Sequence, residues 1–335
     1  MAATFYANDT GDPNPVTTNC SSSTNTDCSL RAAIIAANAA GPGLHTIVLQ
    51  TGATYNLSWD NDGGGHATDS GADNDDLDIT ADITIQGNGA TIQRSGGCTL
   101  DSIAATGEFR IFEVHSGAAL TLQNVTVQNG CADGPIAPND QSGGAIWNSG
   151  TLTVTQSTIS GNSARQDGGG ILNGGTATLT NSTISGNSAS FGSGILNSGG
   201  ATLNASFITV ANNTLGNGID NFNLSTVNIK NSIVANHAPQ QDCANASRAT
   251  FNSQGGNFAS DNTCPGFTQS SSLNLQPLAN NGGPTQTHAL GPGSAAIDAV
   301  SDCTDLNTNS VNQDQRGVSR PQGFQCDAGA FEAGA

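Results

Sequence analysis

The stretch GGGILNGGTATLTNSTISGNSASFGSG, residues 168–194, decides the fold because it repeats the stretch just before it. Residues 143–169 read GGAIWNSGTLTVTQSTISGNSARQDGG, and both stretches contain the pattern GTxTxTxSTISGNSA. A short motif marks the same point in four successive units: AIWN, GILN, GILN and GIDN begin at Ala145, Gly170, Gly194 and Gly218. These starts are about 24–25 residues apart, and repeats of this length indicate stacked structural units.

Each unit holds short β-prone runs, such as TLTVTQSTIS and TATLTNSTIS, which clusters of Gly, Asn and Ser interrupt. Stacking one unit on the next at about 4.8 Å produces parallel sheets. Crossovers between parallel strands are right-handed. The sequence therefore predicts an all-β fold, a right-handed parallel β-helix of about 24–25 residues per turn.

Three further sets of residues recur with the motif and predict columns along the coil. We expect an aliphatic column from Ile159, Ile184, Ile208 and Ile233. A recurring asparagine keeps the same register at Asn162, Asn187, Asn212 and Asn236. A structural ladder is expected from Asn148, Asn173, Asn197 and Asn221. Stacked amides can bond backbone groups at a tight bend, and Asn tolerates left-handed backbone.

The open ends of such a coil must be covered. The segment CSLRAAIIAANAA, Cys28–Ala40, is predicted to be a capping helix, with Asp27 or Ser29 as its N-cap. Leu30, Ile34 and Ala37 share one face of it, which would lie over the first coil. We divide the chain into an N-terminal cap (1–44), the β-helix (45–242) and C-terminal coils and cap (243–335) that continue the β-helix.

Charge and cysteine content narrow the partners and the compartment. The net charge of −18 repels nucleic acid and anionic membranes and disfavours a polyanionic substrate, so Ca²⁺ or a neutral glycan fits better. No apolar run approaches a membrane span. The even number of cysteines without CxxC indicates disulfides and a secreted protein. Pairing neighbours in the sequence, with other connectivities left open, gives Cys20–Cys28, Cys98–Cys131, Cys243–Cys264 and Cys303–Cys326.

Several segments resemble one group of bacterial exported proteins. CSLRAAIIAAN is similar to the CSLREA-type motif, with Ala32 in place of its Glu, and DLDITADITIQGNGATI resembles the strands that follow it. The coils resemble polymorphic-outer-membrane-protein and pectate-lyase-like repeats. The segments 278–300 and 314–332 resemble the choice-of-anchor Q domain. The resemblance implies a secreted or cell-surface β-helix of bacterial-type export and assigns no catalytic residue. No sorting anchor is recognisable after Glu332, which leaves open whether one was removed.

The acidic stretch DNDGGGHATDSGADNDDLD, residues 60–78, is the candidate metal site. Calcium requires six to eight oxygen ligands, which a Gly-rich loop with alternating Asp can supply. The spacing does not match an EF-hand, and a solvated acidic loop is the alternative. The candidate ligands are Asp60, Asp62, Asp73, Asp75 and Asp76.

The catalytic candidates lie in an insertion between Val127 and Ile146, which lengthens one turn, and in the bend region of the next turn. Long loops on a rigid coil often carry function. Two carboxylates about 5–9 Å apart would suit glycoside hydrolysis, whereas a loop pinned by Cys131 with solvated acids is the structural alternative. A lyase would use Lys230 or Arg165 as its base. The hydrolase candidates are Asp133, Asp140 and Asp167, with Arg165 beside them.

Three functional hypotheses follow. The first is a secreted structural or adhesive protein that binds a glycan or matrix component or assembles with its own copies into filaments. The second is a carbohydrate-active enzyme, either a glycoside hydrolase or a polysaccharide lyase. The third is an ice- or surface-binding face, whose hydroxyl array lapses at ATLNAS. Its threonines are Thr151, Thr153, Thr155, Thr176, Thr178 and Thr180. In the tail we expect structural ion pairs among Asp314, Arg316, Arg320, Asp327 and Glu332.

Overall fold

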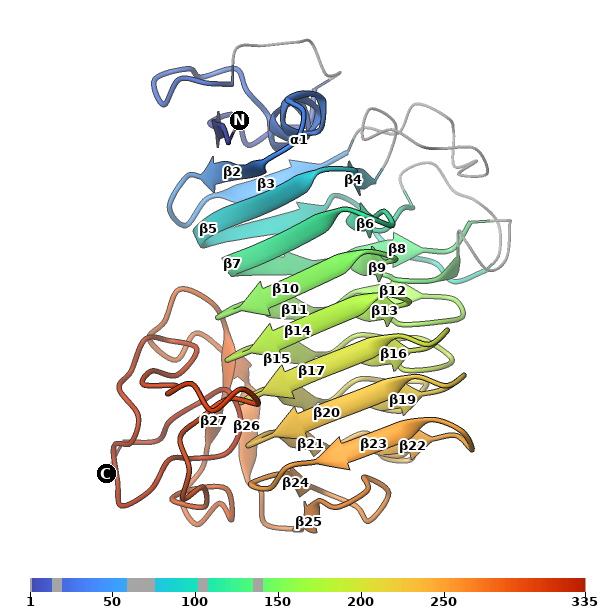
Figure 1. The fold of residues 1–335 in the computed structure, drawn as a ribbon, viewed down its shortest axis with the longest axis vertical. Coiled ribbons are helices and arrows are strands. Elements are labelled where there is room, and N and C mark those ends of the chain that lie inside the picture. The colour runs from blue at the N-terminus through green and yellow to red at the C-terminus, as the bar shows by residue number, and fades with distance from the viewer. Residues whose placement is uncertain (1, 14–19, 59–75, 102–107, 135–140, 335) are drawn as a thin grey trace.

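The computed structural model describes residues 2–13, 20–58, 76–101, 108–134 and 141–334. The chain winds into a stack of parallel strands, with a helix at one end and an irregular segment along one flank (Figure 1). Neighbouring strands within the stack pair in parallel, and the aliphatic side chains between the sheets form one continuous core. The predicted parallel β-helix is therefore confirmed.

The N-terminal cap consists of β1 (Thr4–Ala7) and α1 (Leu30–Ala39), which pack on β2 (Leu44–Leu49) at the end of the stack (Figure 1). Ser29 is the N-cap, because its hydroxyl accepts a hydrogen bond from the backbone N–H of Ala32 at 3.2 Å. Leu30, Ile34 and Ala37 are buried as predicted.

The largest sheet begins at the capped end with β1 and β2 and continues through β5 (Asp82–Arg94) to β7 (Ala119–Gln128). β3 (Thr54–Leu57) also pairs with β5. After β7, each turn of the coil contributes two short strands to this sheet instead of one long strand. A residue with positive φ, such as Gln156 or Asn181, bends the chain between the two strands, so the sheet has two walls. The first wall contains β10 (Thr151–Thr155), β14 (Thr176–Thr180), β17 (Thr202–Ser206), β20 (Thr226–Lys230) and β23 (Thr250–Ser253). The second contains β11 (Thr158–Ser160), β15 (Thr183–Ser185), β18 (Thr209–Ala211), β21 (Ile233–Ala235), β24 (Phe258–Ala259) and β25 (Thr268–Gln269).

A third wall closes the coil. It contains β4 (Leu77–Ile79), β6 (Phe112–Val114), β9 (Ile146–Asn148), β13 (Ile171–Asn173), β16 (Ile195–Asn197), β19 (Ile219–Asn221) and β22 (Cys243–Asn245). Two short strands, β8 (Cys131–Ala132) and β12 (Ser163–Ala164), pair at the corner between the second and third walls. Because side chains alternate along each strand, the middle residue of a third-wall strand points outward.

The predicted asparagine ladder is confirmed. The amide of each member donates to the side-chain oxygen of the next, from Asn148 through Asn173 and Asn197 to Asn221, at 2.7–2.9 Å. The ladder continues to Asn245 at 2.8 Å. Each Nδ2 also donates to a backbone carbonyl of the following turn, such as Thr176 O at 3.1 Å. The ladder thus satisfies buried polar groups that would otherwise destabilise the fold.

The other two predicted columns are wrong in register after the second turn. Ile184 pairs with Val210 rather than Ile208, and on the next turn Val234 takes the place predicted for Ile233, which lies one position earlier, opposite Thr209. The cause is an insertion of two residues within 198–201. It makes Thr176 pair with Thr202 rather than with Gly200. Because side chains alternate with a period of two, the slip of two residues leaves Ile208 facing inward, so the sequence pattern alone does not reveal it. Ile233 is displaced by one residue and packs instead in a second hydrophobic cluster, with Phe331 of the C-terminal segment.

The second asparagine column follows the same shift. Asn162 bonds Asn187 at 2.9 Å, and Asn187 bonds Asn213 rather than Asn212, also at 2.9 Å. Asn213 then contacts the ring of His237 at 3.2 Å, so histidine takes the place predicted for Asn236. Asn212 and Asn236 instead occupy the adjoining corner, where φ is +56° and +66° and where earlier turns place Gly161 and Gly186.

The C-terminal segment, residues 270–334, does not form further coils. It contains the antiparallel pair β26 (Leu275–Ala279) and β27 (Thr287–Leu290), and it lies beside the stack (Figure 1). Gln315 bonds the hydroxyls of Thr158 and Thr183, both on the second wall. This contact joins residues about half the chain apart.

The four disulfides join the cysteines in sequential pairs, as predicted, and no cysteine is free. Such bonds indicate an oxidising compartment. In the part of the chain that the structure describes, no helix has the length and apolarity to cross a membrane.

Candidate functional site

A polar groove runs between the first wall of the coil and the C-terminal segment. Its larger part has a volume of about 640 Å³, and a smaller part of about 120 Å³ shares Thr180 and Asp305 with it. The larger part is lined by Thr155, Gln156, Thr180, Asn181, Asp305, Ser310, Val311, Asn312, Gln313 and Ser319. The smaller part adds Thr178, Leu179, Asn204, Ser206, Leu306 and Asn307.

The coil side of the groove is built by register. Thr155, Thr180 and Ser206 are the last residues of β10, β14 and β17, and parallel pairing places them in one column. The next residue on each turn has positive φ, at Gln156 and Asn181 among others, and turns the chain toward the second wall. The strand ends therefore present a hydroxyl on three successive turns, followed by an amide at Gln156 and Asn181 and by Phe207 on the third turn.

The opposite side is held in place by bonds to the coil. The amide of Asn181 donates to the carbonyl of Gln313 at 2.8 Å, and the N–H of Leu306 donates to the hydroxyl of Ser206 at 3.2 Å. Lys230 makes an ion pair with Asp302 at 2.9 Å and donates to the Thr304 hydroxyl at 2.6 Å. The groove is therefore a fixed feature rather than a gap between independent parts.

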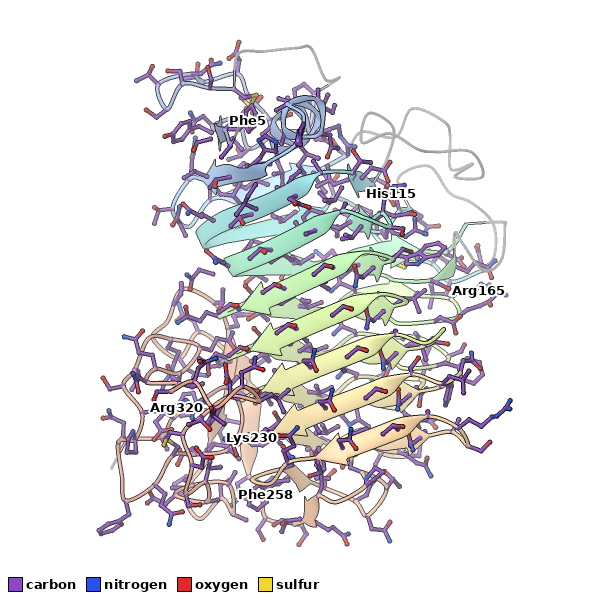
Figure 2. The ribbon with its side chains drawn as sticks, in the orientation of Figure 1. Phe5, His115, Arg165, Lys230, Phe258 and Arg320 are labelled. Atoms are coloured by element: carbon purple, nitrogen blue, oxygen red, sulfur yellow. A yellow bond between two sulfur atoms is a disulfide. The ribbon has the colours of Figure 1, made fainter. Side chains whose placement is uncertain are left out.

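Lys230 is consequently not a free base. Its side chain is largely buried by the C-terminal segment, one turn beyond Ser206 (Figure 2). The sequence-based hypothesis of a lyase base at Lys230 has no support from this geometry, since its ammonium group is already bound to three oxygen atoms.

The acids predicted for hydrolysis are placed differently from one another. Asp133 is fully buried, accepts the backbone N–H of Asp101 at 2.6 Å and lies 3.6 Å from the guanidinium of Arg165, which reaches the edge of the coil (Figure 2). Asp140 lies outside the described residues. Asp167 lies in the stacked corner before the third wall, where its backbone bridges Ser142 on the adjacent turn.

A carboxyl that the sequence did not single out, Asp220, lies near Asp167. Its oxygens accept the N–H of Gly192 at 2.6 Å and the amide of Asn217 at 2.8 Å. Burial raises the pKa of Asp220, and the charge of Asp167 adds to that increase. Burial also raises the pKa of Asp167. Both oxygens of Asp220 therefore accept hydrogen bonds from residues at this corner of the coil, and the carboxyl group stabilises the turn.

A second polar cluster lies on the outer face of the third wall near the capped end. Asp78 and Glu113 are paired on β4 and β6, and His115 follows β6 directly. The His115 ring bonds Asp78 at 2.5 Å, and Arg110 pairs with Asp76 and Glu113 at 2.8 and 2.9 Å. Figure 2 shows His115 at the side of the coil.

In this cluster the pKa of Asp78 and the pKa of His115 are both raised. Burial, together with the Asp76 charge, raises the pKa of Asp78 to about 7, against the opposing hydrogen bond from His115. Burial lowers the pKa of His115, but the bond to Asp78 and the nearby carboxylates outweigh it, so the pKa is raised overall.

Of the predicted calcium ligands, the described residues include only Asp76, whose carboxylate binds Arg110. Asp60, Asp62, Asp73 and Asp75 lie outside the described residues. The calcium hypothesis therefore stays a prediction.

The hydroxyl face is more regular than the sequence suggested. Thr202 takes the position of Thr151 and Thr176, and the column continues through Thr226 and Thr250. In the neighbouring column, Thr153 and Thr178 are followed by three asparagines, Asn204, Asn228 and Asn252. At ATLNAS the second column changes from threonine to asparagine. The first column continues as threonine, because the insertion before Thr202 brings Thr202 opposite Thr176.

Comparison with known proteins adds little to this geometry. No protein-family model matches the sequence, and no curated protein matches it. Among solved structures, the chain is similar to the crystal structure of pectate lyase Pel9A, at 14% identity and a TM-score of 0.49, with 99% of this chain and 97% of that chain covered. A likeness at this level carries no information about activity.

Proposed function

We propose that the protein is a secreted, adhesive β-helix that binds a neutral glycan in the polar groove without hydrolysing it. The observation that carries the proposal is the lining of the groove. Hydroxyl and amide side chains from Thr155, Thr180 and Asn181 face others from Asn312 and Gln313 across a gap fixed by hydrogen bonds. The four disulfides and the resemblance to exported β-helical proteins support secretion.

The chemistry of the lining matches that of a sugar. Each sugar hydroxyl donates and accepts a hydrogen bond, and Thr, Ser, Asn and Gln side chains do both. Among the lining residues, Asp305 alone carries a charge. The net charge of −18 would repel a polyanionic glycan. A neutral chain lying parallel to the coil would meet the same column of groups on successive turns.

The groove does not support hydrolysis. Glycoside hydrolysis generally requires two carboxyl groups on opposite sides of the bond that is cleaved. Asp305 is the single carboxyl of the lining, and its oxygens accept bonds from Asn307 and Asn309 at 2.8–3.0 Å. Asp305 therefore stabilises the turn that contains Asn307 and Asn309. Binding without hydrolysis is the function that the groove supports best.

Affinity electrophoresis with soluble β-glucan, xyloglucan and mannan tests the proposal, with pectate as the anionic comparison. At least one neutral glycan should retard the protein. Asn312→Trp, which fills the groove from an exposed position, should abolish that retardation, whereas Thr151→Trp, on the outer face away from the lining residues, should not. Equal loss in both variants, or retardation by pectate alone, would contradict the proposal. Reducing-sugar release should remain at background.

A second candidate function rests on the threonine column. Thr151, Thr176 and Thr250 are exposed, and the column repeats at the strand spacing of about 4.8 Å. Such an array could match a regular surface, including ice. A thermal-hysteresis measurement tests it: a freezing-point depression that Thr176→Lys removes would support this function, and no depression in the wild-type protein would exclude ice.

A further inference from the structure

The cluster of Asp78, Glu113 and His115 contains a buried acceptor without a donor. Asp78 is 2% exposed, and its Oδ1 bonds the ring of His115. Among the described residues, no group bonds its other oxygen, Oδ2. A buried carboxylate oxygen without a partner costs free energy comparable to a lost hydrogen bond. Within the described residues, Oδ2 is thus open to accept a bond from a further group.

The three side chains are already arranged around a common point. One ligand atom from each of Asp78, Glu113 and His115 lies within 4.8 Å of the others. Strand pairing fixes two of them, because Asp78 and Glu113 are opposite each other on β4 and β6. The third is fixed by the backbone, since the N–H of His115 donates to the carbonyl of Ile79 at 3.0 Å.

Charge in the cluster also favours a cation. The cluster contains three carboxyl groups, from Asp76, Asp78 and Glu113, and one guanidinium, that of Arg110. Arg110 bonds Asp76 and Glu113 and also lies 5.0 Å from the ring of Trp147. With ionised carboxyl groups, the cluster has an excess of negative charge centred on Asp78.

We propose that Asp78, Glu113 and His115 bind a divalent transition-metal ion of the zinc class on the outer face of the third wall. An imidazole nitrogen with two carboxylate oxygens is a ligand set suited to such ions, whereas Ca²⁺ takes oxygen ligands. Glu113 and His115 are partly exposed, which leaves an approach from solvent. The site is separate from the groove and does not depend on the proposed glycan function.

Isothermal titration of ZnCl₂ into the full chain, after treatment with chelator, tests the proposal. The wild-type protein should bind one Zn²⁺ at this site, and Asp78→Asn and His115→Gln should each lower the affinity at least roughly tenfold. Asp82→Asn removes an exposed carboxylate from β5 nearby and is the matched control, so it should bind as the wild type does. Ca²⁺ should bind this site more weakly than Zn²⁺.

Two outcomes would overturn the proposal: no Zn²⁺ binding by the wild-type chain, or unchanged affinity in His115→Gln. The second would place any bound ion elsewhere. His115→Gln alters a side chain that is 32% exposed, so it remains informative if Asp78→Asn fails to fold. Substitution with Co²⁺ gives an independent readout, since its visible spectrum should change when the imidazole ligand is removed and stay the same in Asp82→Asn.

Discussion

The coils and the C-terminal segment are stabilised in different ways. In the coils, each turn repeats the same contacts with its neighbours, so inward aliphatic side chains and stacked asparagines recur once per turn. The C-terminal segment has little regular structure and packs on the coil through a second hydrophobic cluster, which includes Phe207, Ile233 and Phe331. Individual polar side chains add to this packing. Arg320 is the clearest case: its side chain is fully buried, pairs with Glu332 at 2.7 Å, and stacks on Phe207 of the coil.

The difference explains where the groove lies. A repeating wall alone presents a flat, uniform surface, as the columns of threonine and asparagine do. The non-repeating segment adds a second side to that wall, and the two together form the groove. A binding site therefore arises where a periodic structure meets an aperiodic one. The following predictions test how independently the two regions are stabilised, from the largest expected effect to the smallest.

Removing the central charge of the C-terminal segment should have the largest effect. Arg320→Ala leaves Glu332 buried without its partner and removes bonds to the carbonyls of Asp327 and Gly329. Breaking a buried ion pair costs roughly 3–5 kcal/mol. Hydrogen exchange should show lost protection across 270–334 with the coils still protected. Uniform loss of protection across both regions would show that they do not unfold separately.

Breaking the interior amide column should act within the coils. Asn187→Ala removes four hydrogen bonds, which Asn187 makes with Asn162, Asn213 and the carbonyl of Ile159. Two buried backbone groups lose a partner, at roughly 1–3 kcal/mol each. We expect a loss of about 2–4 kcal/mol in the free energy of unfolding, measured by urea denaturation. A loss below about 0.5 kcal/mol, the range of an ordinary surface substitution, would mean that the column is not structural.

The interior amide column ends at His237, whose ring bonds Asp242 at 2.9 Å. This carboxyl group should make the stability of the fold depend on pH. Burial raises the pKa of Asp242, but bonds from His237, Ser260 and Asp261 outweigh it and lower the pKa overall. A lowered carboxyl pKa stabilises the fold above the unfolded-state value of about 4, and this contribution is lost as pH falls through the folded-state value. Asp242→Asn should therefore cost about 1–2 kcal/mol at pH 7 and less near pH 3. A difference in melting temperature that does not change with pH would contradict this.

The exposed amide column should contribute least. Asn228 bonds Asn204 and Asn252 at 2.9 Å, with the same 24-residue spacing as the interior ladder, but it is partly exposed to water. Asn228→Ala should change the free energy of unfolding by no more than about 0.5 kcal/mol. Compared under the same denaturation conditions as Asn187→Ala, it separates the effect of stacking from that of burial. Similar losses in the two variants would show that burial is not the deciding factor.

The repeated part of the fold could be predicted from the sequence because periodicity carries the information. The positions of Asn148, Asn173, Asn197 and Asn221 follow directly from the GILN-type motif. The exact partner of Ile184 could not be predicted, since an insertion of two residues preserves the alternation of side chains. Adjacent asparagines at 212 and 213 conceal the same shift.

The candidate sites could not be found in this way. The groove joins Asn181 to Gln313, residues 132 positions apart with no shared pattern. Ion pairs among the charged residues of the tail were predicted, and the structure forms Arg316–Asp314 and Arg320–Glu332. The sequence did not show which residues pair or that their segment lies beside the coil. The cluster at Asp78 depends on β4 pairing with β6, and the irregular spacing before β7 conceals that pairing. A histidine two residues after an acidic strand position was its only signal.

The register of the coils is the central claim, because it builds the column that lines the groove. Paired cysteines test it directly: the structure pairs Thr178 with Asn204, whereas the register that would align Ile184 with Ile208 pairs Thr178 with Thr202. A disulfide requires Cα atoms closer than about 7 Å. Under mild oxidation, peptide mass spectrometry should detect the cross-link in the double variant Thr178→Cys/Asn204→Cys and not in Thr178→Cys/Thr202→Cys. The opposite pattern would contradict the account.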